Sequence, residues 1–131
     1  MTNDEISAFL KQAIDENRVM LFMKGTPNQP ACGFSARTAG ALNALGVQYA
    51  ALDILPDPRI REELSGLSGW PTIPQLFVDK ELVGGSDIII EMFESGELAE
   101  LLGAEQPEAV EEPPAEAPVQ QRPIGLENNL Q

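Results

Sequence analysis

The sequence is poor in the residues on which most small catalytic and metal-binding sites depend. Its 131 residues include one cysteine, Cys32, and no histidine. One cysteine cannot form a disulfide within the chain, so the fold must hold without covalent cross-links, as suits a reducing compartment. Without histidine, a Ser-His-Asp triad, a Cys-His pair and imidazole metal ligands are excluded within the chain. Cys32 is therefore the candidate for nucleophilic or metal chemistry.

Positive charge and long apolar runs are also scarce. Eight Lys and Arg stand against 21 Asp and Glu, which gives a net charge of −13. This charge argues against nucleic acid and anionic membranes as partners. The N-terminus is acidic, and no apolar run approaches the ~20 residues that a membrane span needs. We expect a soluble, cytoplasmic protein that binds neither nucleic acid nor membrane.

Apolar spacing and capping signals predict alternating helices and strands. A capping box at Thr2-Asn3-Asp4-Glu5 opens a first helix that ends near Asn17. A helix from about Phe34 to Leu45 is expected to turn Phe34 inward and to stop at Gly46. The expected strands are residues 19–23, 47–54, 75–78 and 81–83. Asp57-Pro58 and Ser86-Asp87 are N-cap signals for two further helices, and the chain continues helically after Ser95-Gly96.

The turn between the last two strands, Asp79-Lys80, lacks the glycine that a two-residue turn prefers. Either Lys80 tolerates a strained backbone or the loop is longer than two residues. The element order predicts an α/β fold with a four-stranded mixed sheet and helices on both faces. It combines a parallel pair joined by a helix with an antiparallel hairpin.

The composition changes at Ala104. Residues 104–131 are rich in Pro, Glu, Ala and Gln and contain no aromatic residue. Such a segment cannot bury enough apolar surface to offset its chain entropy. The predicted organisation is one domain over residues 1–103 and a disordered acidic tail over residues 104–131.

Cys32 is expected to lie where the strand 19–23 is joined to the following helix. Unpaired N–H groups at a helix N-terminus carry partial positive charge, which stabilises a thiolate placed there. A thiolate is the form of cysteine that attacks disulfides and binds soft metals. Ser35 stands three residues further on, and a hydroxyl cannot resolve a mixed disulfide, so a resolving thiol must come from outside.

Four motifs then carry a family resemblance. In chain order they are Lys24-Gly25-Thr26-Pro27, Cys32-Gly33-Phe34-Ser35, Trp70-Pro71-Thr72-Ile73-Pro74-Gln75 and Gly84-Gly85-Ser86-Asp87. Together they resemble a monothiol glutaredoxin of the Cys-Gly-Phe-Ser class in its short, single-domain form, over roughly residues 3–103. The resemblance implies a thioredoxin-like (glutaredoxin) fold, a glutathione site, and a 2Fe-2S cluster shared by two subunits and two glutathiones.

The resemblance also implies roles for single residues. Lys24 and Arg61 match carboxylate-binding positions, and Ile73-Pro74 matches a cis peptide bond. Trp70 is expected to pack beneath the site, with partner recognition as the lesser possibility. The implied glutathione-binding residues are Lys24, Phe34, Arg61, Thr72, Ile73, Ser86 and Asp87, of which the last two would hold the γ-glutamyl end, and Cys32 is both the catalytic residue and the metal ligand.

Three functions remain open. The favoured one is a carrier that receives and transfers a 2Fe-2S cluster, a homodimer when loaded, that delivers it to iron-sulfur apoproteins. A 2Fe-2S cluster usually takes four thiolates, and each chain supplies one, so glutathione would complete the set. The alternatives are a weak glutathione-dependent thiol-disulfide oxidoreductase and a regulatory adaptor that pairs with BolA-like proteins.

Overall fold

The computed structural model describes residues 1–105 and 122–123 of the chain. Helices and strands alternate through most of it, as the apolar spacing predicts. No helix in residues 1–105 is long and apolar enough to cross a membrane. The elements are α1 (Asn3–Glu16), β1 (Val19–Met23), α2 (Gly33–Leu45), β2 (Ala50–Asp53), α3 (Pro58–Ser68), β3 (Gln75–Val78), β4 (Glu81–Gly84), α4 (Ser86–Ser95), α5 (Glu97–Leu102) and β5 (Arg122–Pro123).

The strands form one mixed sheet in the order β4-β3-β1-β2-β5. β1 pairs parallel with β2 and antiparallel with β3, and β3 and β4 form the antiparallel hairpin. The predicted α/β fold with a four-stranded mixed sheet is thereby confirmed. The second strand is shorter than the expected 47–54, because pairing with β1 begins at Ala50.

A fifth, two-residue strand was not predicted. β5 pairs parallel with β2, so that Arg122 lies beside Ala50 and Pro123 beside Ala51. β2 would otherwise be an edge strand with unpaired backbone groups on its outer side. The other residues of the predicted tail lie outside the described part of the chain, except Ala104 and Glu105.

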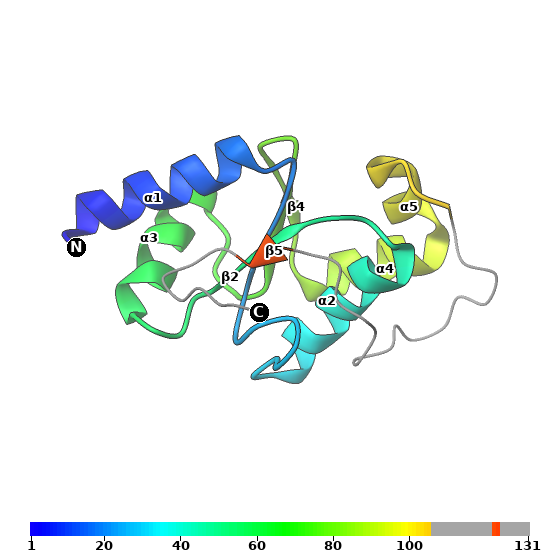
Figure 1. Ribbon diagram of the computed structural model, residues 1–131, viewed down its shortest axis with the longest axis horizontal. Helices are drawn as coiled ribbons and strands as arrows, with labels where there is room; N and C mark the ends of the chain where they lie inside the picture. The colour runs from blue at the N-terminus through cyan, green and yellow to red at the C-terminus, as the bar shows by residue number, and fades with distance from the viewer. Residues whose placement is uncertain (106–121, 124–131) are drawn as a thin grey trace.

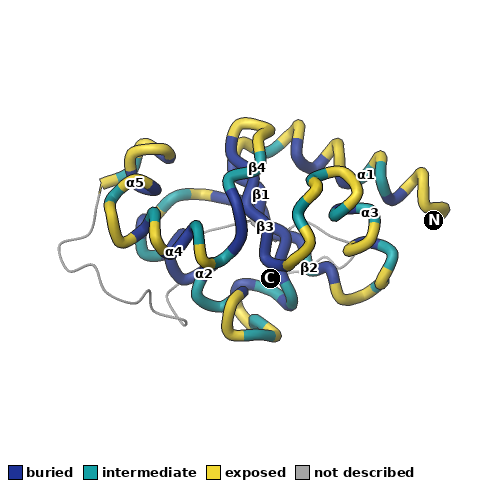
Figure 2. The backbone as a smooth tube through the Cα atoms, turned by 180° about the vertical axis from the view of Figure 1, so that it is seen from behind, coloured by how far each residue is buried: buried dark blue, intermediate teal, exposed yellow. Residues whose placement is uncertain are grey.

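Helices cover both faces of the sheet. Figure 1 shows α1 and α3 on one side and α2, α4 and α5 on the other. β1 is buried along its whole length, and its residues alternate between the two layers as strand geometry requires (Figure 2). Met20 and Phe22 pack with α1 and α3, while Leu21 and Met23 pack with the other three helices.

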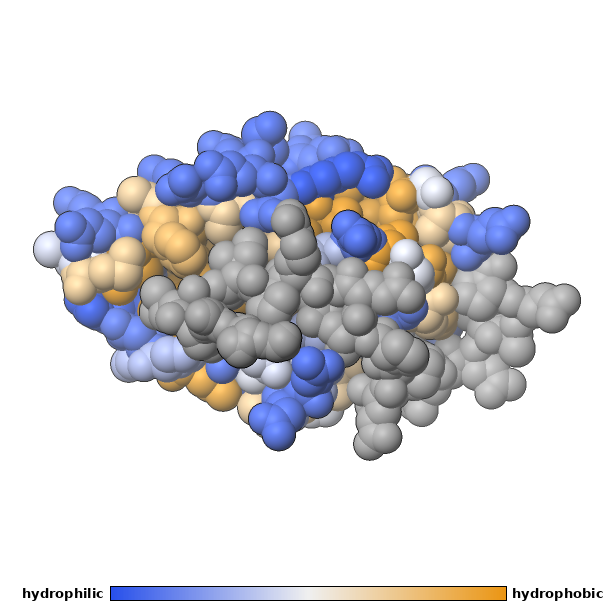
Figure 3. Space-filling model, in the orientation of Figure 1, coloured by the Kyte–Doolittle hydropathy of each residue, from blue (hydrophilic) through white to orange (hydrophobic). Residues whose placement is uncertain are grey.

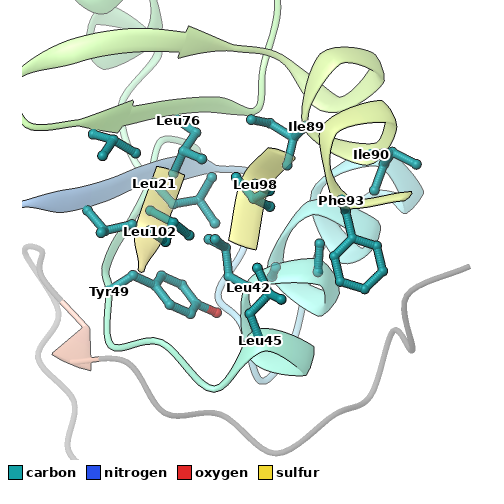
Figure 4. Packing of buried hydrophobic residues seen from close by; sticks show 14 of the residues in the cluster. Leu21, Leu42, Leu45, Tyr49, Leu76, Ile89, Ile90, Phe93, Leu98 and Leu102 are labelled. Atoms are coloured by element: carbon teal, nitrogen blue, oxygen red, sulfur yellow. The ribbon is translucent and has the colours of Figure 1, made fainter. Parts of the chain in front are cut away.

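The core under α2, α4 and α5 is the larger of the two. Leu42 and Leu45 of α2, Ile89 and Phe93 of α4, and Leu98 of α5 meet there (Figure 4). The core between the sheet and α1 and α3 includes an edge-to-face pair of Phe22 and Phe77 with ring centroids 5.7 Å apart. On the face shown in Figure 3, hydrophobic side chains of the described residues appear in separate patches between hydrophilic ones.

Helix boundaries follow the capping signals in the sequence. Thr2 and Glu5 form the predicted capping box, with Oγ1 of Thr2 accepting from the N–H of Glu5 at 3.1 Å. α2 ends at Gly46, which adopts the left-handed backbone that favours glycine. Asp57 caps α3 and Pro58 is its first residue.

The turn between β3 and β4 resolves the choice left open by the sequence. It has two residues, and both Asp79 (φ 52°) and Lys80 (φ 73°) are in the left-handed region. The N–H of Asp79 donates to the carbonyl of Arg18 at 2.8 Å, and the Arg18 side chain lies 3.3 Å from the Asp79 carboxylate. Lys80 therefore adopts the less favourable backbone in a turn that is fixed from outside.

Candidate functional site

The connection from β1 to α2 folds back on itself before it reaches Cys32. The N–H of Ala31 donates to the carbonyl of Lys24 at 2.9 Å, and Thr26 and Gln29 exchange two backbone hydrogen bonds inside this closure. Gly25 has φ 85°, and a Cβ there would lie 2.5 Å from the carbonyl oxygen of Gln29. Only glycine fits this corner, so the Lys-Gly pair of the sequence motif has a physical reason.

Cys32 is the N-cap residue of α2. Its Sγ accepts a hydrogen bond from the N–H of Ser35 at 3.4 Å, and it lies 3.4 Å from Oγ of Ser35. Partial burial raises the pKa of the thiol, but hydrogen bonds from Ser35 and Phe34 and the charge of Lys24 together outweigh it. The pKa of Cys32 is therefore lowered from its ordinary value, and the half-exposed thiol is poised as thiolate.

Ser35 does more than replace a second cysteine. Its side chain is fully buried, and its Oγ accepts from the N–H of Lys24 at 3.0 Å while its hydrogen remains available to the sulfur of Cys32. The hydroxyl thus joins the Lys24 end of the loop to the thiol. Sequence reasoning missed this role because it considered Ser35 only as an absent thiol.

A second wall of the site is the segment from Trp70 to Pro74. The buried amide of Gln75 donates to the carbonyls of Trp70 at 3.0 Å and Thr72 at 3.1 Å. Arg61 of α3 donates to the carbonyl of Pro71 at 3.2 Å, which turns its guanidinium toward this wall. The Ile73-Pro74 bond is cis, as the resemblance implied.

The third wall is the start of α4, where one prediction was wrong. The N-cap is Gly85 and not Ser86, which is the first residue of the helix, and in the described structure no side chain caps this end. The half-buried Trp70 explains the glycine, because a Cβ at Gly85 would lie 2.9 Å from Nε1 of Trp70. Trp70 therefore packs against the start of α4, and the first N–H groups of α4 have no side-chain cap in the described structure.

The three walls enclose one open cavity of about 340 Å³. Residues from four separate segments of the chain meet around it. Its lining residues are Lys24, Phe34, Arg61, Thr72, Ile73, Ser86 and Asp87. These are the seven residues that the resemblance implied for glutathione, and Cys32 lies two residues before Phe34 in the same loop and helix start.

Phe34 takes the opposite orientation to the one expected from helical spacing. It was expected to turn inward, but 59% of its surface is exposed. Phe34 is in the first turn of α2, and side chains in a helix lean toward its N-terminus, beyond which there is no core. Periodicity alone cannot detect this end effect, while the cofactor-binding role implied by the resemblance needs the exposed orientation.

A smaller hollow of about 170 Å³ adjoins the cavity between α2 and α4. Phe34, Ser86 and Asp87 line both spaces, and Arg37, Ile90, Glu91 and Glu94 complete the second one. The sequence analysis did not single out Arg37. Its signal was present, since Arg37 stands three residues after Phe34 and so lies on the same side of α2.

Within residues 1–105 the chain offers a soft metal one ligand. No group of three or more cysteine, aspartate or glutamate side chains lies close enough to hold an ion there. Cys32 is a thiolate donor two residues before Phe34, which lines the open cavity, and a single thiolate suits a site shared between chains better than a site closed within one chain.

A strand, a cysteine at the start of the next helix and a cis-proline segment across from it define a thiol protein of the thioredoxin-like fold. The Glutaredoxin family model matches residues 19–83. The "uncharacterized monothiol glutaredoxin ycf64-like" of Synechocystis is 49% identical over 100 residues, which cover 76% of this chain and 94% of the relative. Glutaredoxin 4 of Escherichia coli K12 is 53% identical over 93 residues, with 71% and 81% covered.

Solved structures agree with these matches. A monomeric truncated mutant of Trypanosoma brucei 1-C-Grx1 has a TM-score of 0.69 at 39% identity and covers 79% of this chain and 96% of its own. Reduced poplar apo GrxS14 has a TM-score of 0.67 at 39% identity, with 75% and 90% covered. The chain therefore belongs to the monothiol glutaredoxin family.

Proposed function

We propose that this monothiol glutaredoxin carries a 2Fe-2S cluster as cargo, held between two copies of the chain and two glutathione molecules. The observation that carries the proposal is the donor count at the cavity. Cys32 is the only cysteine in each chain and so its only thiolate ligand, and such clusters usually take four thiolates. Two chains supply two, and glutathione is the abundant cellular thiol that can supply the others.

The cavity offers groups of the right charge for a tripeptide that has a carboxylate at each end. Lys24 and Arg61 both line the cavity with cations, and Arg61 is oriented by its hydrogen bond to the carbonyl of Pro71. At the other end, the uncapped start of α4 offers N–H groups to a carboxylate, and Asp87 offers an anion to an ammonium. Thr72 and Ile73 lie between these ends, and because the side chain of Ile73 is buried, only its backbone can face an extended peptide.

Cys32 contributes a sulfur whose pKa is lowered from its ordinary value, which favours the thiolate. The N–H of Ser35 and the nearby Lys24 charge stabilise the thiolate, and the cap position keeps it at the helix start. Phe34 covers the site from the α2 side with its exposed ring. These features support the binding of glutathione with its sulfur beside Cys32.

Reconstitution with iron and sulfide under anaerobic conditions tests the proposal. With glutathione present, we expect visible absorption of a 2Fe-2S cluster and sedimentation as a dimer, and without glutathione we expect neither. Chelation of the iron should return the protein to a monomer. A cluster that forms equally well without glutathione would contradict the proposed ligand set, and an equally tight dimer after chelation would contradict the shared site.

A glutathione-dependent thiol-disulfide exchange is the second candidate function, because the lowered pKa of Cys32 also favours a nucleophile. In that reaction the thiolate attacks the glutathione sulfur of a glutathionylated protein. The protein thiolate leaves, and Cys32 is now joined to glutathione in a mixed disulfide. A second glutathione thiolate then attacks that disulfide, which releases oxidised glutathione and restores Cys32. Turnover of a glutathionylated peptide by the cluster-free protein measures this activity directly.

A further inference from the structure

The connections that follow the two parallel strands are tied together by one side chain. Asp53 is the last residue of β2, and its Oδ1 accepts from the N–H of Gly25 at 2.9 Å and from the N–H of Leu55 at 2.9 Å. Gly25 belongs to the connection from β1 to α2, and Leu55 to the connection from β2 to α3. The half-buried carboxylate therefore fixes the corner at which the chain leaves β1.

This corner is held on every side. The N–H of Lys24 donates to Oγ of Ser35 at 3.0 Å, and the carbonyl of Lys24 accepts from Ala31 at 2.9 Å. Asp53 holds the next N–H group along, at Gly25. The backbone of Lys24 is thus fixed at both of its peptide groups, so its side chain leaves toward the cavity from a defined point.

We propose that Asp53 is a positioning residue for the glutathione site, which holds the Lys24–Gly25 corner so that Lys24 faces the cavity and Cys32 follows a closed loop. Asp53 does not line the cavity and acts through Gly25. The inference rests on the proposed function, because glutathione is the ligand that Lys24 would contact. It gives a structural reason for an aspartate at the end of β2, a position that the sequence predicted to lie within the strand 47–54.

The chain provides a matched control in Asp57. That carboxylate also accepts a backbone N–H two residues further on, from Arg59 at 3.0 Å, in the same connection. It caps α3 and bonds to the Arg59 guanidinium, and within residues 1–105 it makes no hydrogen bond to Lys24 or Gly25. Loss of Asp57 should therefore lower stability without changing the site.

The test compares Asp53→Ala, Asp53→Asn and Asp57→Ala in the full chain. Amide hydrogen exchange at Gly25 reports on the corner directly and needs no ligand. We expect exchange at Gly25 to accelerate at least about tenfold in Asp53→Ala beyond the change in global stability. The asparagine variant keeps an acceptor oxygen and should restore protection, and Asp57→Ala should leave it unchanged.

Glutathione titration by calorimetry supplies the second measurement. Asp53→Ala should weaken binding roughly five- to tenfold, as expected when one hydrogen bond no longer orients a binding group, and Asp57→Ala less than about twofold. Equal weakening by both alanine variants at equal loss of melting temperature would show a merely structural role and overturn the proposal. The proposal would also be overturned if the amide of Gly25 exchanged as fast in Asp53→Asn as in Asp53→Ala.

The two proposals fail in different ways. If the wild-type protein binds no glutathione, the proposed function fails, whatever happens at Gly25. If it binds glutathione but Gly25 stays protected in Asp53→Ala, the positioning role fails and the proposed function stands. Protection lost at Gly25 with affinity unchanged would also overturn the positioning role, because the corner would then not matter to the ligand.

Discussion

The starts of α2 and α3 are both capped by a side chain, but the capping atom differs between them. Both helices follow one of the two parallel strands, and both begin with an extended residue whose side chain accepts a first-turn N–H. At α3 the acceptor is the Asp57 carboxylate, 3.0 Å from the N–H of Arg59 and paired with the Arg59 guanidinium at 2.8 Å. At α2 it is the sulfur of Cys32, 3.4 Å from the N–H of Ser35.

The difference between the two caps separates stability from chemistry. Asp57 is a preferred N-cap residue, and its carboxylate is paired with the Arg59 guanidinium. It is therefore less available to bind a group from outside the chain. Cys32 is a poorer acceptor, and its half-exposed side chain lies two residues before Phe34, which lines the open cavity. The capping sulfur of α2 thus remains available for reaction, while the capping carboxylate of α3 is occupied by its ion pair with Arg59.

The largest effect is expected when the capping sulfur of α2 is replaced. Cys32→Ser should lose the cluster completely while the fold stays intact, because serine is a hard ligand that hardly ionises but a favoured N-cap. We expect the free energy of unfolding to stay within about 1 kcal/mol of the wild type or to rise. Iron and sulfide assays after reconstitution measure the loss, and thermal melts measure the fold. A variant that still held iron and sulfide in equal amounts would exclude Cys32 as the ligand.

The long connection before α2 depends on a glycine that the short one before α3 does not need. Gly25→Ala should cost at least about 2 kcal/mol, because Cβ would meet backbone atoms at 2.5 and 2.6 Å in a left-handed residue. Gly46→Ala is the matched control, since Gly46 is also left-handed but has no atom within 4 Å, and should cost about 1 kcal/mol. Urea unfolding of both variants measures the difference. Equal costs would mean that the loop can open without penalty.

Removing the Asp57 cap of α3 should lower stability without changing the reactivity of Cys32. Asp57→Ala is expected to lower the melting temperature by a few degrees, because the N–H of Arg59 and the guanidinium both lose their acceptor. Alkylation of Cys32 by iodoacetamide should proceed at the wild-type rate. A change in that rate would show that the two helix starts are coupled more closely than their separate hydrogen bonds imply.

The two caps should respond to pH at opposite ends of the scale. The pKa of Cys32 is lowered in the folded protein, so its contribution is complete above the pKa of the unfolded thiol, about 8.5, and is lost as pH falls through the folded pKa. The melting temperature of the wild type relative to Cys32→Ser should therefore rise with pH up to about pH 8.5, the ordinary pKa of a thiol. Hydrogen bonds from Arg59 lower the pKa of Asp57, so its contribution disappears only in strongly acidic solution. A wild-type advantage that fell with rising pH would contradict a stabilised thiolate.

The smallest effect concerns β2, the strand that leads to α3. A chain that ends at Glu105 loses β5, which pairs with only two residues of β2. We expect the melting temperature to fall by no more than about 2 °C and cluster loading to stay the same. Faster amide exchange confined to Ala50 and Ala51 would identify the lost pairing. A larger fall would mean that the segment after residue 105 contributes to the core.

The sequence predicted the fold well because the elements have strong local signals. Capping residues at Thr2, Asp57 and Gly46 set helix ends, and the strand expected over residues 19–23 is β1. Residues at the site were harder. Phe34 has core spacing but lies past the core, and the capping position before α4 belongs to Gly85 because Trp70 leaves no space for a side chain there.

The seven residues around the cavity were identified from the family resemblance and not from periodicity, since they come from separate segments. Asp53 and Ser35 could not be found in that way. Their roles depend on partners 28 and 11 positions away in the chain, and no local pattern encodes such a contact. An aspartate after a strand and a serine in a helix are both ordinary at the surface, and the tertiary structure gives these two their roles.

Because the chain has a single thiol, the oxidation state of Cys32 can be measured from the intact mass of the protein. Cys32 has no second cysteine among the 131 residues, so no oxidation to a disulfide can leave the mass of the molecule nearly unchanged. Disulfide formation must either add the partner thiol or double the mass. Intact-mass spectrometry of protein quenched with acid would therefore count, in one spectrum, the free, glutathione-bound and disulfide-dimerised molecules in a sample.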